Sequence, residues 1–131
     1  MARLRIVWNY SSGSSTSNDL WNVPIDGRYE ISASVYIQGA ASSTGAAALN
    51  LFAGTDTGST FYDLHLIGTG LAMPSTTAVA TSVSGSIVLP LDKDDRVGIY
   101  VQSTDGMIVI AGTVPGNTDV PATFASVTRI A

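Results

Sequence analysis

The chain has 131 residues, which suits one domain with a core large enough to stand without disulfides or a structural metal. Charged residues make up only 12% of it, and its 6 basic residues are scattered and outnumbered by 10 acidic ones, so nucleic acid is not expected as a partner. There is no cysteine, and no apolar run is long enough to span a membrane. A chain with so little charge is typical of a subunit whose surface other subunits partly cover, so we expect an oligomer.

Alternation of apolar and polar residues predicts short strands along the whole chain. They are expected at 4–8, 21–25, 28–37, 47–53, 61–67, 79–91, 96–102, 107–111 and 122–130, with loops at 11–18, 39–45 and 113–121 and an irregular piece at 69–77. The clearest of them, 28–37, places Tyr29, Ile31, Ala33, Val35 and Ile37 on one face. No helical period and no internal repeat compete with this pattern. Residues 1–131 are therefore predicted to form a single all-β sandwich or jelly roll.

The stretch 82–109 carries the strongest strand pattern. Its first strand runs into an acidic turn, Asp92-Lys93-Asp94-Asp95, and its second follows directly, which predicts neighbouring antiparallel strands. Asp105-Gly106 between 96–102 and 107–111 predicts a hairpin, since both residues tolerate positive φ. Trp21, Tyr29 and Phe124 are expected in the core.

Three segments, in order, resemble the globular heads of complement component one q (C1q) and tumour necrosis factor (TNF). Trp21 followed after five residues by Gly27-Arg28-Tyr29-Glu30-Ile31 is similar to the family's aromatic, five residues, Gly-x-Tyr-x-Phe. The stretch 84–97 resembles its Ser-Gly strand running into Leu-x-x-Gly-Asp-x-Val, with Asp94 where the family has glycine. Thr123-Phe124-Ala125-Ser126 is similar to the closing Thr-Phe-Ser-Gly. No collagen-like stalk is present, which argues against an animal complement role.

The resemblance implies a ten-stranded antiparallel jelly roll that assembles as a homotrimer and binds or caps without catalysis. Tyr36 and Tyr100 lie opposite the apolar faces of their strands, so in such a trimer we expect them, with Phe61, at the subunit interface. Trp8, Tyr10 and Tyr62 are the aromatic residues expected to face a ligand.

Two groups of residues suggest chemistry and also have plainer structural explanations. Asp92, Asp94 and Asp95 offer oxygen ligands to a hard cation such as calcium, as in some relatives, but acidic residues also simply favour turns. Lys93 and Arg96 partly neutralise them, and no cofactor is expected otherwise. His65 is the only histidine, and no Gly-x-Ser-x-Gly nucleophile elbow is present, so the chain is not expected to be an enzyme.

The function expected is that of a homotrimeric structural or binding protein of a virion, such as a bacteriophage capsid decoration knob or a tail-fibre tip. Its partners would be its own copies and capsid or tail proteins, or a host-surface receptor. With no signal peptide evident after Met1, we expect it to be made in the cytoplasm and to reach a virion or other extracellular particle from there. The alternative is a soluble lectin or adhesion module that binds glycan or protein through the loops 11–18 and 113–121.

Overall fold

A computed structural model describes most of the chain as β-structure. It describes the backbone of residues 2–3, 7–10, 14–15, 20–40, 47–56, 62–72, 81–103, 108–111, 113–114, 117–121 and 123–131, and the side chains of 20–37, 48–55, 63–71, 81–102 and 123–131.

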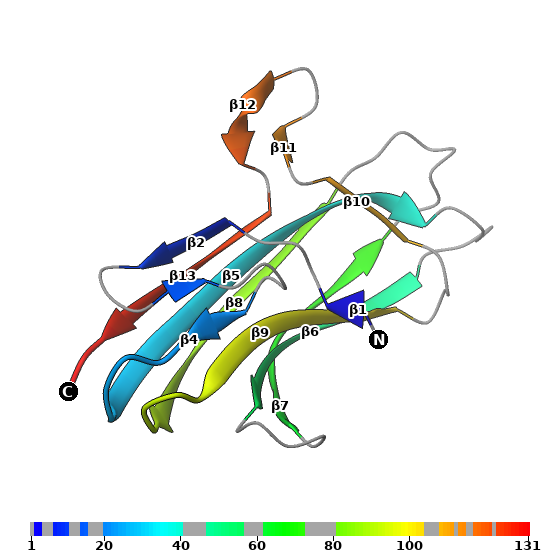
Figure 1. Cartoon of the computed structure of the whole chain (residues 1–131). Helices are drawn as coiled ribbons and strands as arrows, with labels where there is room; N and C mark the ends of the chain where they lie inside the picture. Colours follow the sequence, from blue (N-terminus) through cyan, green and yellow to red (C-terminus); the bar gives the residue numbers. More distant parts are fainter. Residues whose placement is uncertain are drawn as a thin grey trace.

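Two sheets pack face to face as a sandwich (Figure 1). Sheet A has the order β3 (Ser14–Ser15), β4 (Trp21–Asn22), β9 (Arg96–Ser103), β6 (Ala47–Asp56) and β7 (Tyr62–Ala72), with β1 (Ala2–Arg3) also paired to β9. Sheet B is built on β5 (Gly27–Ala40), which pairs with β8 (Thr81–Leu91), β13 (Phe124–Arg129) and β10 (Ile108–Ala111), and β2 (Val7–Tyr10) lies beside β13. A separate two-stranded ladder joins β11 (Thr113–Val114) to β12 (Asn117–Pro121).

The core lies between the sheets and follows the period-two pattern of their strands. All five predicted apolar positions of β5, from Tyr29 to Ile37, are buried. From sheet A they meet alternate residues of β6 and β9, namely Leu49, Leu51, Ala53, Val97, Ile99 and Val101. The Trp21 and Tyr29 rings meet edge to face with centroids 5.3 Å apart, and the Tyr29 hydroxyl donates to the Ile25 carbonyl at 2.7 Å. The Tyr29 ring therefore fills the core while its hydroxyl keeps a hydrogen-bond partner, and these two contacts hold the side chain in one orientation.

The two sheets approach most closely where β7 and β8 meet, and glycines make this possible. A Cβ added to Gly85 would overlap the Ile67 carbonyl oxygen, and one added to Gly68 would lie 2.5 Å from the Ser84 carbonyl oxygen. Both obstacles are backbone atoms, which cannot rotate away as a side chain can. The sandwich is therefore closed along this side by backbone packing that any larger residue would prevent.

The acidic turn between β8 and β9 is held by hydrogen bonds to its own residues and to the chain near Asp26. The Asp94 amide donates to the Val23 carbonyl, and the Val23 amide donates to the Asp95 carbonyl, both at 2.9 Å. The Asp95 carboxylate accepts from the Asp92 amide at 3.0 Å, and the Asp26 carboxylate accepts from the Lys93 amide at 2.7 Å. The Asp26 and Asp95 carboxylates thus accept hydrogen bonds from backbone amides, which is a structural role of carboxylates in a turn.

Asp94 has a φ of 72°, which lies in the left-handed region. The family pattern has glycine at this position, the residue that adopts such a φ at the lowest cost. We expect Asp94→Ala to lower the free energy of unfolding by about 1 kcal/mol. In the left-handed region the alanine Cβ crowds the backbone carbonyl, and alanine has no polar side chain whose hydrogen bonds would offset this strain. Asp94→Gly should leave stability unchanged or raise it slightly, since relief of strain is partly cancelled by greater freedom of the unfolded chain. Urea unfolding midpoints of both variants test this, with the exposed neighbour change Lys93→Ala as control; equal midpoints for Asp94→Ala and the control would contradict it.

Several sequence predictions are corrected by the sheet pairing. The predicted Asp105-Gly106 hairpin would pair β9 with β10, but β10 pairs with β5 in the other sheet, so the chain crosses the sandwich there. The acidic turn likewise carries the chain from sheet B to sheet A and does not join paired strands. Inside the predicted loop 113–121, β11 and β12 pair with each other. One pairing, β13 with β2, is parallel, whereas an antiparallel fold was expected.

Two further expectations fail for reasons of register. Phe124 was expected in the core but is 45% exposed, because Ala125 and Val127 take the inward positions of β13. The stretch 69–77 was expected to be irregular, yet β7 continues to Ala72. Pairing with β6 carries the strand past Gly68 and Gly70, with a register shift between Leu51 and Phe52. Tertiary pairing here overrides the weak strand propensity of glycine.

Candidate functional site

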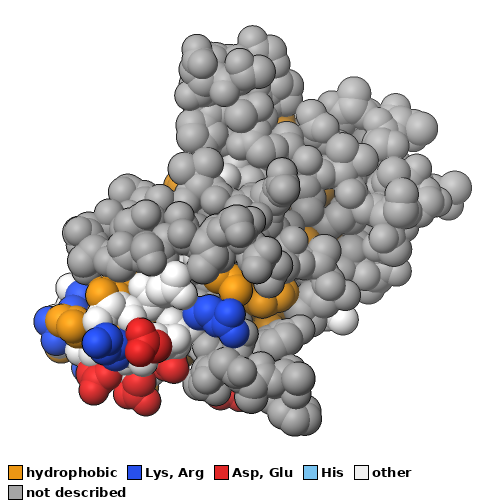
Figure 2. All heavy atoms as spheres, in the orientation of Figure 1, with side chains coloured by type: hydrophobic (Ala, Val, Ile, Leu, Met, Phe, Trp, Pro, Cys, Tyr) orange, Lys and Arg blue, Asp and Glu red, His pale blue; other side chains and the backbone are white. Residues whose placement is uncertain are grey.

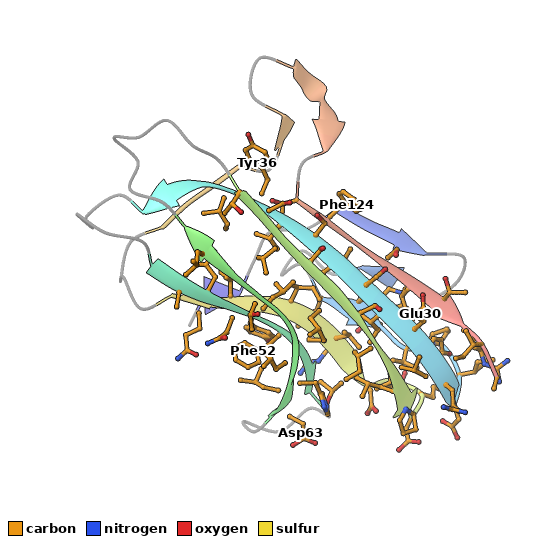
Figure 3. The ribbon with its side chains drawn as sticks, turned by 180° about the vertical axis from the view of Figure 1, so that it is seen from behind. Glu30, Tyr36, Phe52, Asp63 and Phe124 are labelled. Carbon is orange, nitrogen blue, oxygen red and sulfur yellow. The ribbon has the colours of Figure 1, made fainter. Side chains whose placement is uncertain are left out.

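The outer face of sheet B is a nearly uncharged surface of small hydroxyl side chains. Cross-strand pairing places Ser34 beside both Ser84 and Phe124, and Ser32 beside both Ser86 and Ser126. The Ser32 and Ser126 hydroxyls are hydrogen bonded at 2.6 Å. Among the described side chains of this face, charged residues appear only where this row of outward positions meets the end of the sandwich, at Arg28 and Glu30. Tyr36 and Phe124 lie farther along from Glu30 (Figure 3).

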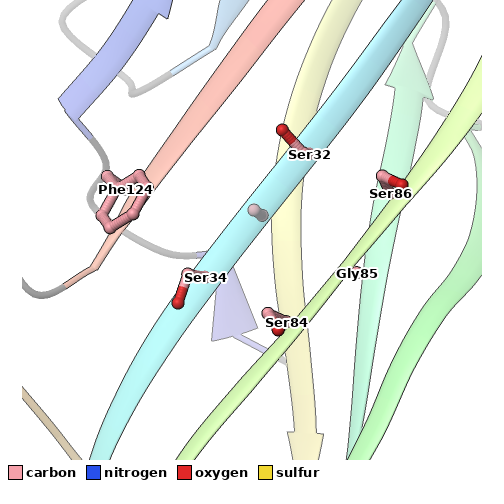
Figure 4. A pocket seen from close by; sticks show the side chains of 7 residues that line it. Ser32, Ser34, Ser84, Gly85, Ser86 and Phe124 are labelled. Atoms are coloured by element: carbon pink, nitrogen blue, oxygen red, sulfur yellow. The ribbon is translucent and has the colours of Figure 1, made fainter.

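A shallow depression of about 310 Å³ lies on this face, which we call the serine recess. It is lined by Ser32, Ala33, Ser34, Ser84, Gly85, Ser86 and Phe124 (Figure 4). The recess exists because β5 and β8 carry side chains no larger than serine here, while the Phe124 ring stands beside them. Its lining holds no histidine, carboxylate or amine, so it can donate and accept hydrogen bonds but has no group to activate a hydroxyl.

The outer face of sheet A differs from that of sheet B, because large apolar side chains project from it. Pairing places Phe52 of β6 between Leu66 of β7 and Tyr100 of β9. The Tyr100 ring lies over two glycines: a Cβ on Gly54 would come within 2.6 Å of its Cε2 atom and one on Gly98 within 3.1 Å. Tyr100 is only 8% exposed, whereas Leu66 is 56% exposed. This face is therefore apolar at its centre and uncovered toward β7.

Charge gathers at the end of the sandwich that holds the acidic turn and the last residues of the chain (Figure 2). Apart from Asp63, the described charged side chains belong to the start of β5 and the residues before it, to the acidic turn and the start of β9, and to the end of β13: Asp26, Arg28, Glu30, Asp92, Lys93, Asp94, Asp95, Arg96 and Arg129. The Arg129 guanidinium donates to the Asp26 carbonyl at 3.2 Å, and the Arg28 amide donates to the Ala131 carbonyl at 3.0 Å. Positive and negative side chains alternate over this surface, so it has no region of one charge that would attract a charged ligand.

The predicted calcium ligands do not come together as a site. Within the described residues, no group of three or more histidine, cysteine, aspartate or glutamate side chains is placed to hold a metal ion, and Asp92, Asp94 and Asp95 are among those residues. The Asp95 carboxylate is instead turned to the Asp92 amide within the turn. The geometry thus gives the cation prediction no support, and it favours the plainer explanation that carboxylates stabilise this turn.

The residues predicted for a subunit interface are not brought to one surface. Tyr36 lies on the outer face of sheet B, and its backbone amide donates a hydrogen bond to the Thr123 hydroxyl at 3.2 Å. Tyr100 lies on the outer face of sheet A, where its own chain already covers most of it. Phe61 lies outside the described residues. Their place at a subunit interface stays a prediction.

The remaining predicted residues lie mainly where side chains are not described. Trp8 and Tyr10 belong to β2, and Tyr62 begins β7, but only their backbone is described. His65 is half-buried on β7 opposite Ala53, away from the residues that line the serine recess. The described part of the chain contains no helix of the length and apolarity that crossing a membrane requires.

Sequence reasoning missed both outer faces. Serines at 32, 34, 84 and 86 read simply as the polar side of two amphipathic strands, and nothing in their spacing indicates that they share a recess with Phe124. The leucines of β7 did leave a signal, since the stretch 61–67 is apolar on both faces at its ends.

Comparison with known proteins supports the fold. No family model matches the chain, and no curated protein matches it. Among solved structures, "Eiger TNF from S. frugiperda" matches with a TM-score of 0.61 at 17% sequence identity, over 91% of this chain and 69% of that one. The chain therefore has a TNF-like fold, a two-sheet β-sandwich of the kind that the sequence resemblance implies.

Proposed function

We propose that this chain is a non-enzymatic binding or structural module that works as a homotrimer, with the outer face of sheet B turned toward neighbouring subunits. The observation that carries the proposal is the serine recess on a face with almost no charge. A sheet face exposed to solvent normally carries charged side chains at many of its outward positions, whereas depletion of charged residues is typical of the centre of an interface. The TNF-like fold and the overall charge content of 12% support the same conclusion.

The chemistry of the recess gives no support to catalysis there. Four serine hydroxyls surround it, but a serine nucleophile needs an adjacent base, and none of the residues lining the recess is one. The residues suit close packing against a neutral surface, because each hydroxyl can both donate and accept a hydrogen bond.

We expect static light scattering after size exclusion to give the mass of three chains of 13.5 kDa for the wild type. Ser34→Arg should give a single-chain mass with an unchanged far-ultraviolet circular dichroism spectrum, because it places a long cation at the centre of the face that is buried in the trimer. Thr128→Arg is the control, since Thr128 is exposed outside the serine recess, at the charged end of the same sheet beside Glu30. A single-chain mass for the wild type would overturn the trimer, and a trimeric Ser34→Arg would move the contact off this face.

The finer proposal places the trimer on a particle, as a capsid decoration knob or tail-fibre tip of a bacteriophage. It stays a prediction drawn from the sequence, as does the localisation to a virion or other extracellular particle. The alternative, a lectin or adhesion module, predicts glycan- or protein-dependent binding through 11–18 and 113–121. A glycan array with the purified chain separates the lectin from the decoration knob, because a structural knob should bind none of the glycans.

A further inference from the structure

The dipeptide Asp26-Gly27 has a backbone that can isomerise without an enzyme. The glycine nitrogen attacks Cγ of the preceding aspartate, a step that the absence of a glycine Cβ leaves unhindered. An N–Cγ bond forms, the carboxyl hydroxyl leaves with the amide proton as water, and a five-membered imide results. When water then opens the imide at its main-chain carbonyl, the chain runs through the aspartate side chain as isoaspartate. The mass is unchanged, but the backbone is one methylene longer.

The fold keeps this reactive dipeptide at an exposed position. Asp26 is exposed in the bend that precedes β5, and Gly27 is the first residue of that strand. A Cβ on Gly27 would lie 2.5 Å from the Arg129 Nε atom and 2.7 Å from the Ala131 carbonyl oxygen, so packing against β13 and the residues after it opposes any larger residue. Because glycine is required here, any protection of the dipeptide comes from the contacts around it.

The carboxylate and the carbonyl of Asp26 are both anchored to other parts of the chain. One carboxylate oxygen accepts a hydrogen bond from the Lys93 amide, in the acidic turn, at 2.7 Å. The main-chain carbonyl accepts from the Arg129 guanidinium at 3.2 Å. Both bonds have one charged partner, which makes them stronger than bonds between neutral groups. The side chain that would be attacked is therefore fixed in direction.

The attacking nitrogen is also engaged, by the sheet. Arg28 directs both of its backbone groups to the residues after β13: its amide donates to the Ala131 carbonyl at 3.0 Å, and its carbonyl accepts from the Ile130 amide at 2.8 Å. Since consecutive residues of a strand point their backbone groups to opposite sides, Gly27 points its N–H toward β8, where it is paired with Leu91. A nitrogen in this position has to leave the ladder before it attacks a carboxyl group.

We propose that Asp26-Gly27 is a latent isomerisation site, which the acidic turn keeps closed and which reacts when this end of the sandwich opens locally. Ring closure requires the carboxylate to leave the Lys93 amide and Gly27 to leave β8, and both are events of local opening. In the product the carboxylate is displaced and a methylene is added before Gly27, so the two contacts cannot form again in register. The backbone thus keeps a permanent record of the opening. This inference does not depend on the homotrimer proposed above.

Lys93→Pro removes the amide donor and suits the conformation of the turn. The Asp95 amide donates to the Asp92 carbonyl at 3.1 Å, and Asp94 is the one described non-glycine residue with a positive φ. A turn with this hydrogen bond and a positive φ at its third residue is type II, in which proline is favoured at the second residue, here Lys93. Lys93→Ala is the matched control, because it shortens the side chain and keeps the amide.

We expect Lys93→Pro to form isoaspartate at Asp26 about tenfold faster than the wild type at neutral pH, because a hydrogen bond to a carboxylate shifts a local opening equilibrium by about that factor. Lys93→Ala should match the wild type. The tryptic peptide that ends at Arg28 contains either form, and the two have one mass but different retention in chromatography. A protease that cleaves before aspartate and not before isoaspartate assigns the position. Equal rates in Lys93→Pro and the wild type would overturn the proposal.

A second measurement needs no substitution, so it decides the question even if Lys93→Pro does not fold. In urea well below the unfolding midpoint, the wild-type isomerisation rate should depend on urea much less steeply than the unfolded fraction, since a local opening exposes little surface. The fully unfolded chain gives the unprotected rate. A native rate equal to the unprotected rate would show that the contacts do not protect Asp26. A rate that follows the unfolded fraction would show that only global unfolding exposes the site, and either result overturns the proposal.

Discussion

Gly85→Ala is expected to lower the free energy of unfolding by about 3 kcal/mol, because an added methyl in a packed interior forces the surrounding structure apart. The added Cβ would overlap the Ile67 carbonyl oxygen, and the Gly68 amide nitrogen lies 3.3 Å from the same position. Neither group can move without shifting β7 away from β8. Because this is where the two sheets meet at their edges, the change should disturb the whole sandwich and not only one side chain.

Gly70→Ala provides a matched control two residues farther along β7 from Gly68. A Cβ there would lie 3.6 Å from the nearest atom, Cβ of Val83, which is ordinary van der Waals contact. We expect its unfolding midpoint in urea to equal or exceed that of the wild type, since alanine also restricts the unfolded chain. Equal midpoints for Gly85→Ala and Gly70→Ala would show that β7 and β8 are not packed backbone to backbone.

The sequence predicted the strands of this fold better than their partners. The alternation in 28–37 identified the inward side of β5 correctly, because one buried face leaves a period-two record in the sequence. The connections after 92–95 and 105–106 left no such record, because a turn that crosses between sheets uses the same acidic and glycine residues as a hairpin. The error for Phe124 has a similar origin. Hydrophobicity placed it inside, whereas the register of β13 turned Ala125 and Val127 inward.

The candidate site could be predicted less well than the fold. A recess made by small side chains depends on the lateral order of β8, β5 and β13, which a single sequence does not contain. The acidic turn illustrates the opposite problem, since its aspartates attract attention as ligands while the Asp26 and Asp95 carboxylates accept backbone amides. Tyr100 combines both difficulties. It was expected opposite the apolar face of its strand, but Gly54 and Leu20, which help to cover its ring, are distant in sequence, so its burial within its own subunit could not be foreseen.

Tyr100→Asp is therefore expected to impair folding of the subunit and not only its assembly. The ring lies over Gly54 and Gly98, with Leu20 beside Gly98 and Leu64 beside Gly54. Aspartate would leave this space unfilled and place a carboxylate among apolar groups, which together should lower the free energy of unfolding by about 4 kcal/mol. An interface role for Tyr100 makes a different prediction, namely a folded single chain of near-native stability.

Urea unfolding and light scattering at matched protein concentration separate these outcomes, since the stability of an oligomer depends on concentration. Leu66→Asp is the matched control, because it introduces the same charge on the same outer face at a position that is 56% exposed. We expect Leu66→Asp to be folded, because Leu66 is exposed, and Tyr100→Asp to be unfolded or aggregated. Tyr100→Asp could instead be a folded single chain with the same unfolding midpoint as Leu66→Asp. That result would place Tyr100 at the surface between subunits. It would also show that packing of the Tyr100 ring against its own chain does not stabilise sheet A.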